Sequence, residues 1–342
     1  MRWQANTALA LWHFAFVVVV TGLESTIKES TAQMWPFLET LTVGNPHFNV
    51  LAFYTALVLS LYAILGAFIW LKPLEVAKKP YLTWAIMIPL LMLPLWLGPV
   101  FWILTVLLIS IYGFKEFAKG TGLYAQKAHC LTVYVVMIAM AVCAMINDYG
   151  LFMVAPIWGV VALSTIPVFQ NRFENAIQNM ALSVVGLVYF GWFLGHLGFL
   201  VRSEYGLGYL LFVLIFTQFN DAMCFLWGKL FGKTHFTAIS PKKTIEGSVL
   251  ALLSSMVIAF LNWPIAFPHF EWWLVAMAGF AVSFGGQMGD LVMSTFKRDL
   301  GVKDFGTLLP GHGGILDRVD SLVWVSPLFF HMARYFHSGF GC

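Results

Sequence analysis

Long apolar stretches separated by short polar segments run through most of the chain. A helix needs about 20 apolar residues to cross the hydrocarbon core of a bilayer, with a range of roughly 17 to 25. The pattern predicts an all-α fold, a polytopic integral membrane helical bundle with roughly nine to eleven transmembrane helices. The shorter candidates suit tilted, re-entrant or buried helices. The candidate crossings are residues 8–23, 50–71, 82–97, 99–114, 130–146, 151–169, 181–200, 207–220, 248–263, 272–286 and 321–334.

Two parts of this pattern allow more than one structure. Leu97-Gly98-Pro99 interrupts a long apolar run, and because glycine and proline favour a tight turn we predict a helical hairpin there, with one kinked helix as the alternative. The apolar stretch Ala8–Val20 follows Arg2 as in a secretory signal. No small-x-small cleavage site follows in Thr21-Gly22-Leu23, so we expect a retained first helix.

Composition strengthens the membrane interpretation. Of the 342 residues, 60% are hydrophobic and only 10% are charged, whereas a soluble domain carries about 25% charged residues. So little charge cannot cover a water-facing surface, which excludes soluble globular, disordered and nucleic-acid-binding proteins. The four cysteines form no C-x-x-C pair, so we expect free thiols rather than metal ligands.

Basic residues gather in loops that the predicted crossings place on one side of the bilayer. Only Lys28 and Arg202 fall in the opposite loops. By the positive-inside rule the basic side is cytoplasmic. Eleven crossings would then put the N-terminus inside and the C-terminus outside. The basic side holds Lys72, Lys78, Lys79, Lys115, Lys119, Lys127, Arg172, Lys229, Lys233, Lys242, Lys243, Lys297, Arg298, Lys303 and Arg318.

Charge is concentrated in the last third of the chain. Between Asp221 and Asp320 lie 16 of the 35 charged residues, and all but Glu271 fall on the basic side. Ionisable groups near a membrane cost several kcal/mol each unless they are paired or hydrated, so they mark functional sites. We therefore predict an N-terminal multispanning scaffold over 1–206 and a region that carries the site over 207–342.

Several of these charges fall on one face of a predicted helix. Asp290, Ser294 and Lys297 stand at positions i, i+4 and i+7, which stacks a carboxylate, a hydroxyl and an ammonium along one stripe. The alternative is a solvated helix end that leaves the bilayer.

Two further acids follow a glycine-rich loop. Gly311-His312-Gly313-Gly314 lets backbone N–H groups approach a ligand closely, although a plain flexible loop would look the same. Asp317 and Asp320 would share a helix face and repel each other, and a divalent cation would hold both ionised. Oxygen-only ligands favour Mg²⁺. The alternative is that Asp317 pairs with a neighbouring lysine or arginine.

A basic segment upstream resembles a helix start. Ser240 would be the N-cap and Pro241 the first helical residue, which would place Lys242 and Lys243 in the first turn. Cations at this position would bind a phosphate group of a ligand. The alternative is a basic cluster that contacts anionic lipid headgroups. Asp221 is either a buried acid of the site or a helix-end residue that faces water.

These residues together resemble the signature of the phosphatidate cytidylyltransferase (CDP-diacylglycerol synthase) family. The resemblance covers about 207–330, and Asn220-Asp221 with Ser240–Gly247 is similar to a second block of that family. One departure follows Asp221, where Ala222-Met223-Cys224-Phe225 replaces the small residues and tyrosine usual in the family. A paralogue that accepts another phosphorylated lipid would show such a change. The signature reads Ser294-x2-Lys297-Arg298-x4-Lys303-Asp304-x-Gly306-x2-Leu309-Pro310-Gly311-His312-Gly313-Gly314-x2-Asp317-Arg318-x-Asp320.

The resemblance implies an Mg²⁺-dependent reaction, with one or two metal ions, in which CTP and phosphatidate give CDP-diacylglycerol and pyrophosphate at the cytoplasmic face. In a bacterium the membrane would be the cell inner membrane. Expected partners are CTP, phosphatidate, the lipid bilayer and a second copy of the chain as a homodimer, and no nucleic acid. A CTP-dependent lipid or polyprenol kinase would need similar residues, and a transporter would spread its charges along a path through several spans.

We assign the residues accordingly. Asp290, Asp317 and Asp320 are the expected metal ligands and, with Lys297, the catalytic residues. The expected substrate- or phosphate-binding residues are Asp221, Lys242, Lys243, Ser294, Arg298, Lys303, His312, Gly313, Gly314 and Arg318.

Overall fold

The computed structural model describes residues 46–71, 75–235, 237–306 and 313–336. The predicted crossing at 8–23 lies outside these residues. Within them the chain is helical, apart from loops and a single β-bridge between His235 and Thr244. The helices are α2 (Pro46–Leu71), α3 (Glu75–Leu97), α4 (Pro99–Gly120), η1 (Leu123–Ala125), α5 (Lys127–Met145), α6 (Tyr149–Gln170), α7 (Ala176–Gly186), the π-helical η2 (Leu187–Phe193), α8 (Leu194–Leu200), α9 (Gly206–Phe231), α10 (Ile245–Leu261), α11 (Trp263–Ala266), α12 (Trp272–Asp299) and α13 (Leu316–Phe336).

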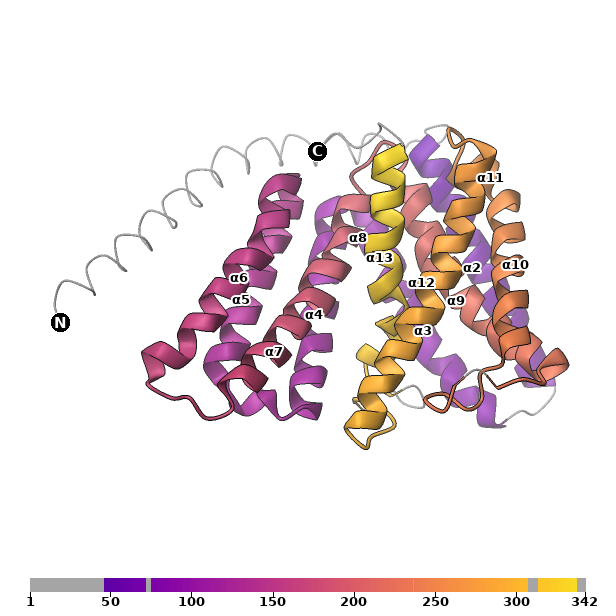
Figure 1. Ribbon diagram of the computed structural model, residues 1–342. Coiled ribbons are helices and arrows are strands. Elements are labelled where there is room, and N and C mark those ends of the chain that lie inside the picture. The colour runs from indigo at the N-terminus through magenta and orange to yellow at the C-terminus, as the bar shows by residue number, and fades with distance from the viewer. Residues whose placement is uncertain (1–45, 72–74, 236, 307–312, 337–342) are drawn as a thin grey trace.

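The helices form one bundle whose two sides are joined by central helices (Figure 1). On one side lie α5, α6 and α7, and on the other lie α2, α9, α10 and α12. The indole N–H of Trp102 on α4 donates to the Leu197 carbonyl on α8 over 3.1 Å. The Tyr149 ring of α6 packs on the Phe330 ring of α13, with 5.2 Å between the ring centroids. These buried contacts place α4, α8 and α13 between the two sides.

Seven helices of the described chain are long and apolar enough to cross a membrane. They include α2, α4, α5, α6, α9, α12 and the continuous stretch Ala176–Leu200. Tyr81–Leu97 and Ile245–Leu261 are apolar but shorter, and α13 carries charged residues in its first turns. The polytopic helical bundle is thus confirmed, whereas the predicted count of nine to eleven crossings is not.

The chain reverses direction between α3 and α4, as the turn signal predicted. Helix α3 ends at Leu97 and α4 begins at Pro99, with Gly98 between them at φ 120° and ψ 173°. Trp96 at the end of α3 donates to Thr55 of α2 over 3.2 Å, and further down α4 Glu116 reaches the start of α13. The structure therefore has a hairpin rather than one kinked helix.

The basic loops that the sequence placed on one side meet at one end of the bundle. The C-terminal ends of α4, α6, α9 and α12 all lie at the lower end in Figure 1. Lys119, Arg172, Lys229 and Lys297 stand at these four ends. The charge pattern along the sequence therefore predicted correctly which ends of these helices share a face of the bundle.

We predict that Gly98→Ala lowers the free energy of unfolding by about 1–3 kcal/mol, because the backbone region of Gly98 is open almost only to glycine. Thermal unfolding of the purified protein in detergent measures this loss. The matched control is Gly150→Ala, which adds a methyl group on an exposed helical turn. Equal unfolding midpoints for both variants would contradict the strained turn.

Candidate active site

Residues from four segments of the last third of the chain meet at the lower end of the bundle in Figure 1. The segments are the second half of α9, the loop before α10, the C-terminal turns of α12 and the first turns of α13. Three side-chain contacts connect them, namely Lys243 with Asp290, Lys297 with Asp317, and Ser321 with Asp221. The structure thus brings together residues that the sequence singled out from a stretch of about 100 positions.

The centre of this cluster is Lys297, which lies between two acids. Its Nζ is 2.8 Å from Asp317 Oδ1 and 3.5 Å from Asp320 Oδ2. The side chains of Lys297 and Asp317 are only 12% and 2% exposed, so little water screens their charges. Removing one partner of a buried ion pair costs about 3–5 kcal/mol, because the other charge is left uncompensated. The repulsion expected between Asp317 and Asp320 is therefore offset here by a lysine, which was the alternative to a metal ion.

A second ion pair joins α12 to the basic loop. Lys243 Nζ lies 2.6 Å from Asp290 Oδ2, and both side chains are partly exposed. The Ser294 hydroxyl donates to Asp290 Oδ1 over 3.4 Å, which confirms that these residues share one face of α12. Asp290 thus contacts the basic loop, and its charge also acts on Asp320 near the start of α13.

Asp221 lies inside the cluster rather than at a water-facing helix end. The Ser321 hydroxyl donates to Asp221 Oδ2 over 3.0 Å, and the Ser321 backbone N–H donates to Asp320 Oδ1 over 3.0 Å. The charges of Asp320 and Asp290 also act on the Asp221 carboxyl. Three acids on α9, α12 and α13 therefore repel one another, and the lysines lower that repulsion.

A buried amide anchors the helix that carries Asp221. Asn220 is fully buried, and its Oδ1 accepts the hydroxyls of Ser283 over 2.7 Å and Ser255 over 3.3 Å. These serines belong to α12 and α10, so one side chain connects three helices next to Asp221. The two hydroxyls satisfy Oδ1 and favour this packing of the three helices, whereas the buried Nδ2 has no hydrogen-bond partner in the described chain.

Asp317 also shapes the glycine-rich loop. Its Oδ2 accepts the backbone N–H of Gly314 over 2.9 Å and that of Phe305 over 3.1 Å. Gly313 has φ 79°, and a Cβ there would lie 2.7 Å from the same oxygen. The predicted loop residue His312 lies outside the described residues. The described part of the loop is therefore folded around the Asp317 carboxylate.

Glu116 belongs to this site although the sequence analysis did not single it out. Its Oε1 accepts the N–H of Ile315 over 3.2 Å, and its Oε2 accepts that of Leu316 over 2.8 Å. These are free N–H groups at the start of α13, where a carboxylate is favourable. Glu116 lies on α4, within the part of the chain predicted to be scaffold. The only signal was an acid at the end of an apolar run, and no spacing connects it to α13.

The structure corrects the predicted helix start upstream of α10. The helix begins at Ile245, and the Thr244 hydroxyl is the cap that accepts the Gly247 N–H over 3.2 Å. Ser240 and Pro241 precede it in the loop, so Lys242 and Lys243 lie before the helix rather than in its first turn. The reason is a contact with the preceding segment, since Glu246 accepts the backbone N–H groups of Lys233 and Thr234 and holds the loop against the helix start.

The remaining predicted residues lie at the rim. Arg298 donates from Nε to the Ile239 carbonyl over 3.3 Å, so it positions the same loop. Lys242 and Lys303 are exposed, while Arg318 is half-buried and its Nε is a buried donor without a hydrogen-bond partner in the described chain. None of these three cations forms an ion pair among the described residues, and the charge of Arg318 acts on Asp320.

No three His, Cys, Asp or Glu side chains are gathered to hold a metal ion among the residues that the structure describes. The cations beside the predicted metal ligands are lysine ammonium groups. A carboxylate-only donor set nevertheless suits Mg²⁺, which commonly takes one or two carboxylates together with substrate phosphates.

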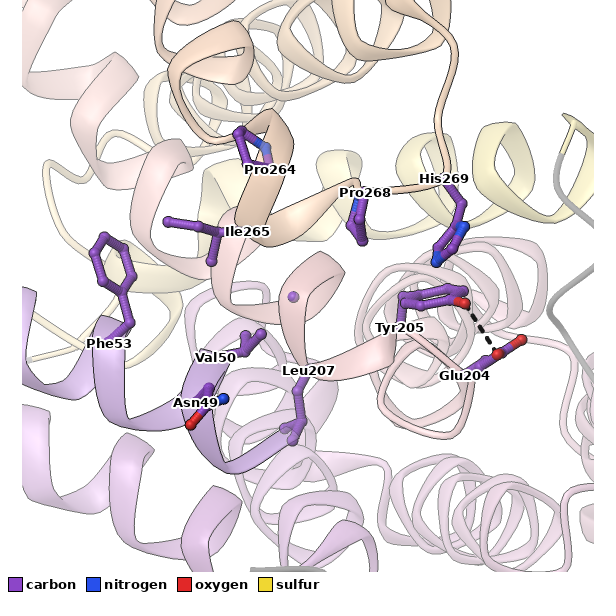
Figure 2. Close-up of a pocket in the computed structure, with 11 residues that line it drawn as sticks. Asn49, Val50, Phe53, Glu204, Tyr205, Leu207, Pro264, Ile265, Pro268 and His269 are labelled. Carbon is purple, nitrogen blue, oxygen red and sulfur yellow. Dashed lines mark hydrogen bonds between the residues drawn. The ribbon is translucent and has the colours of Figure 1, made fainter. Parts of the chain in front are cut away.

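A cavity at the other end of the bundle differs in chemistry (Figure 2). It measures about 670 Å³ between α2, α9 and α11, and most of its lining is apolar. Figure 2 shows Tyr205 below His269, with its hydroxyl donating to Glu204. Glu204 is the one charged lining residue, so this cavity offers nothing to neutralise a triphosphate. From Gly208 at its wall, Asp221 lies roughly 20 Å further along α9.

Comparison with known proteins gives the class to which this site belongs. The model of the cytidylyltransferase family matches residues 78–336, which is more than half of the chain. The chain therefore belongs to the cytidylyltransferase family, and the predicted resemblance is confirmed. The match includes Glu116 and extends well beyond residues 207–330, where the sequence signature was found. The division of the chain at 206 stays a prediction.

Three curated proteins are similar to this chain over part of their length. The uncharacterized protein YnbB of Escherichia coli K12 is 38% identical over 165 residues, which are 45% of this chain and 55% of that protein. A phosphatidate cytidylyltransferase of Staphylococcus epidermidis is 38% identical over 169 residues, 49% of this chain and 64% of that enzyme. A phosphatidate cytidylyltransferase of Staphylococcus saprophyticus is 35% identical over 203 residues, which are 58% of this chain and 75% of that enzyme. The chain spans less than two thirds of the length of the first two relatives.

We predict that Glu116→Gln exposes the start of α13, because an amide has one acceptor oxygen and no charge for two N–H donors. Loss of a charge-assisted hydrogen bond of about 1.5–3 kcal/mol should speed amide exchange of Ile315 and Leu316 about tenfold or more. Hydrogen–deuterium exchange of peptides covering 313–320 measures this. Glu271→Gln, at the opposite end of the bundle, is the control. Unchanged amide exchange in Glu116→Gln would show that the Glu116 carboxylate does not stabilise the start of α13.

Proposed function

We propose that the protein transfers the CMP group of CTP to the phosphate of phosphatidate, giving CDP-diacylglycerol and pyrophosphate. One observation carries the proposal. Acids are paired with lysines at a single end of a membrane bundle, and Lys297, Asp317 and Asp320 stand at positions that match the family signature. The family of the chain and the names of the staphylococcal relatives support this choice of reaction.

The reaction makes demands that such a site meets. The attacking phosphate monoester has a second pKa of about 6, so it is largely ionised at neutral pH and needs no strong general base. The main barrier is negative charge gathered on CTP, on phosphatidate and on the leaving pyrophosphate. Positioned cations lower this barrier by electrostatic stabilisation.

The lysines would act by exchanging partners. In the free protein Lys297 and Lys243 neutralise carboxylates, and an arriving triphosphate competes for the same ammonium groups. Lys242, Lys303, Arg298 and Arg318 would bind the remaining phosphate oxygens, together with Ser294, Gly313 and Gly314.

Asp290, Asp320 and Asp317 are the proposed ligands of one or two Mg²⁺ ions that arrive with the nucleotide. Asp290 is partly exposed, whereas Asp320 is buried and its Oδ2 lies 3.5 Å from Lys297, so a metal ion would replace lysine contacts at both acids. Asp317 is less available to a metal ion, because it pairs with Lys297 and accepts hydrogen bonds from two backbone N–H groups. Bound Mg²⁺ would supply positive charge to the triphosphate. Asp221 would keep Ser321 and Asp320 in place.

We further propose that the site faces the cytoplasm, because the basic ends of the helices lie beside it. In a bacterium this is the cytoplasmic face of the inner membrane. A homodimer stays a prediction.

We predict that Asp320→Asn and Lys243→Gln each lower CTP-dependent formation of CDP-lipid by about 100-fold or more, because each removes a charge used in the transition state. Purified protein with phosphatidate in mixed micelles and labelled CTP provides the assay. Asp299→Asn changes an exposed acid at the end of α12 and should keep full activity. Release of CDP in place of pyrophosphate would identify a lipid kinase instead and would overturn the proposed reaction.

We predict that turnover stops when Mg²⁺ is removed with a chelator and returns when Mg²⁺ is added back. Asp290→Asn should raise the Mg²⁺ concentration needed for half-maximal rate, because one carboxylate ligand is lost. Asp299→Asn should leave that concentration unchanged. Full activity in the chelator would exclude the metal.

A further inference from the structure

A polar cavity lies apart from the acidic cluster, at the same end of the bundle. It measures about 410 Å³ and is enclosed by the N-terminus of α5 and the connection between α6 and α7, at the lower left of Figure 1. Binding sites for small ligands commonly measure about 300–1,000 Å³. The lining includes the side chains of Gln126, His129, Gln170, Arg172, Asn175 and Asn179.

His129 is the buried polar group of this cavity. It is only 3% exposed, and neither Nδ1 nor Nε2 has a hydrogen-bond partner in the described chain. A buried polar group without a partner costs about 1–3 kcal/mol. A ligand oxygen that accepts from this imidazole would recover that free energy.

Two helix N-termini and a guanidinium give the cavity a preference for anions. Helix α5 starts beside Gln126 and helix α7 beside Asn175, and neither residue forms a side-chain cap. Free N–H groups at such ends bind phosphate groups. Arg172 lines this cavity and, with Lys127, a second one of about 430 Å³ beside it. Glu174 is exposed and is the one acid of the lining; it balances Arg172, and Lys127 adds a further cation in the neighbouring cavity.

The surroundings indicate that the anion belongs to a lipid. Around the α6–α7 connection, Phe169 is 83% exposed and Phe173 88%, and Val168 and Ile177 are similarly exposed. Such an apolar surface next to the cavity is suited to acyl chains rather than to water. The cavity lies at helix ends, which is the depth of lipid headgroups.

We propose that this cavity binds the phosphate group of a membrane phospholipid, with its acyl chains along the exposed α6–α7 surface. His129, Arg172 and the N-termini of α5 and α7 bind the phosphate oxygens. This site is separate from the acidic cluster on α12 and α13, and the proposal does not depend on the reaction catalysed there.

Native mass spectrometry of the delipidated full chain in detergent tests the proposal, with phosphatidylglycerol as the probe. We expect one tightly bound lipid per chain. Arg172→Gln and His129→Asn should each weaken this binding about tenfold, which corresponds to the loss of one hydrogen bond to a charged group. Lys229→Gln, an exposed cation at the same end but on α9, should bind as the unchanged protein does.

Two further ligands separate the sources of the phosphate. Diacylglycerol has the chains without the phosphate, and glycerol 3-phosphate has the phosphate without the chains, so neither should displace the bound lipid at equal concentration. Displacement by glycerol 3-phosphate would indicate a soluble anion instead. Binding that is unchanged in Arg172→Gln, or weakened equally in Lys229→Gln, would overturn the proposal. Arg172 is exposed, so its variant tests the site even where His129→Asn fails to fold.

Discussion

The arrangement of the site depends on the position of one ammonium group between two buried carboxylates. Asp317 and Asp320 stand three residues apart on α13, and Lys297 of α12 lies within 3.5 Å of both. Without that cation the first turns of α13 would carry two uncompensated charges in poorly hydrated surroundings. The approach is close, since a Cβ at Gly289 would lie 2.5 Å from the Asp320 carbonyl. The glycine therefore allows α12 and α13 the spacing that the ion pairs require.

The same constraint connects stability with the proposed chemistry. A site for a triphosphate must hold many cations, and in the free protein those cations need acids beside them. Lysine pairs meet this need because an ammonium on a flexible side chain can exchange a carboxylate for a phosphate. Glu116 holds the start of α13 from another part of the bundle, so the acids keep their positions while the lysines exchange partners.

Much of the site could be predicted from the sequence because its residues follow local rules. Asp290, Ser294 and Lys297 share a face through helical spacing alone, and the glycine-rich loop directly precedes a helix with two acids. Glu116 could not be predicted, because 199 residues separate it from Ile315 and tertiary packing alone brings them together. The predicted N-cap of α10 was wrong, because serine and threonine are both favourable N-cap residues and the sequence offers Ser240 as well as Thr244. The contacts of Glu246 with Lys233 and Thr234, which decide between them, are not visible in the local pattern.

The central claim is that Lys297 is needed because of the acids it neutralises. Thermal unfolding of three variants in detergent tests it, namely Lys297→Met, the double variant Asp317→Asn/Asp320→Asn, and the triple variant that combines them. If the charges are coupled, Lys297→Met alone unfolds at a lower temperature than the triple variant, in which no buried charge is left unpaired. Losses in the triple variant that equal the sum of the other two would contradict the account.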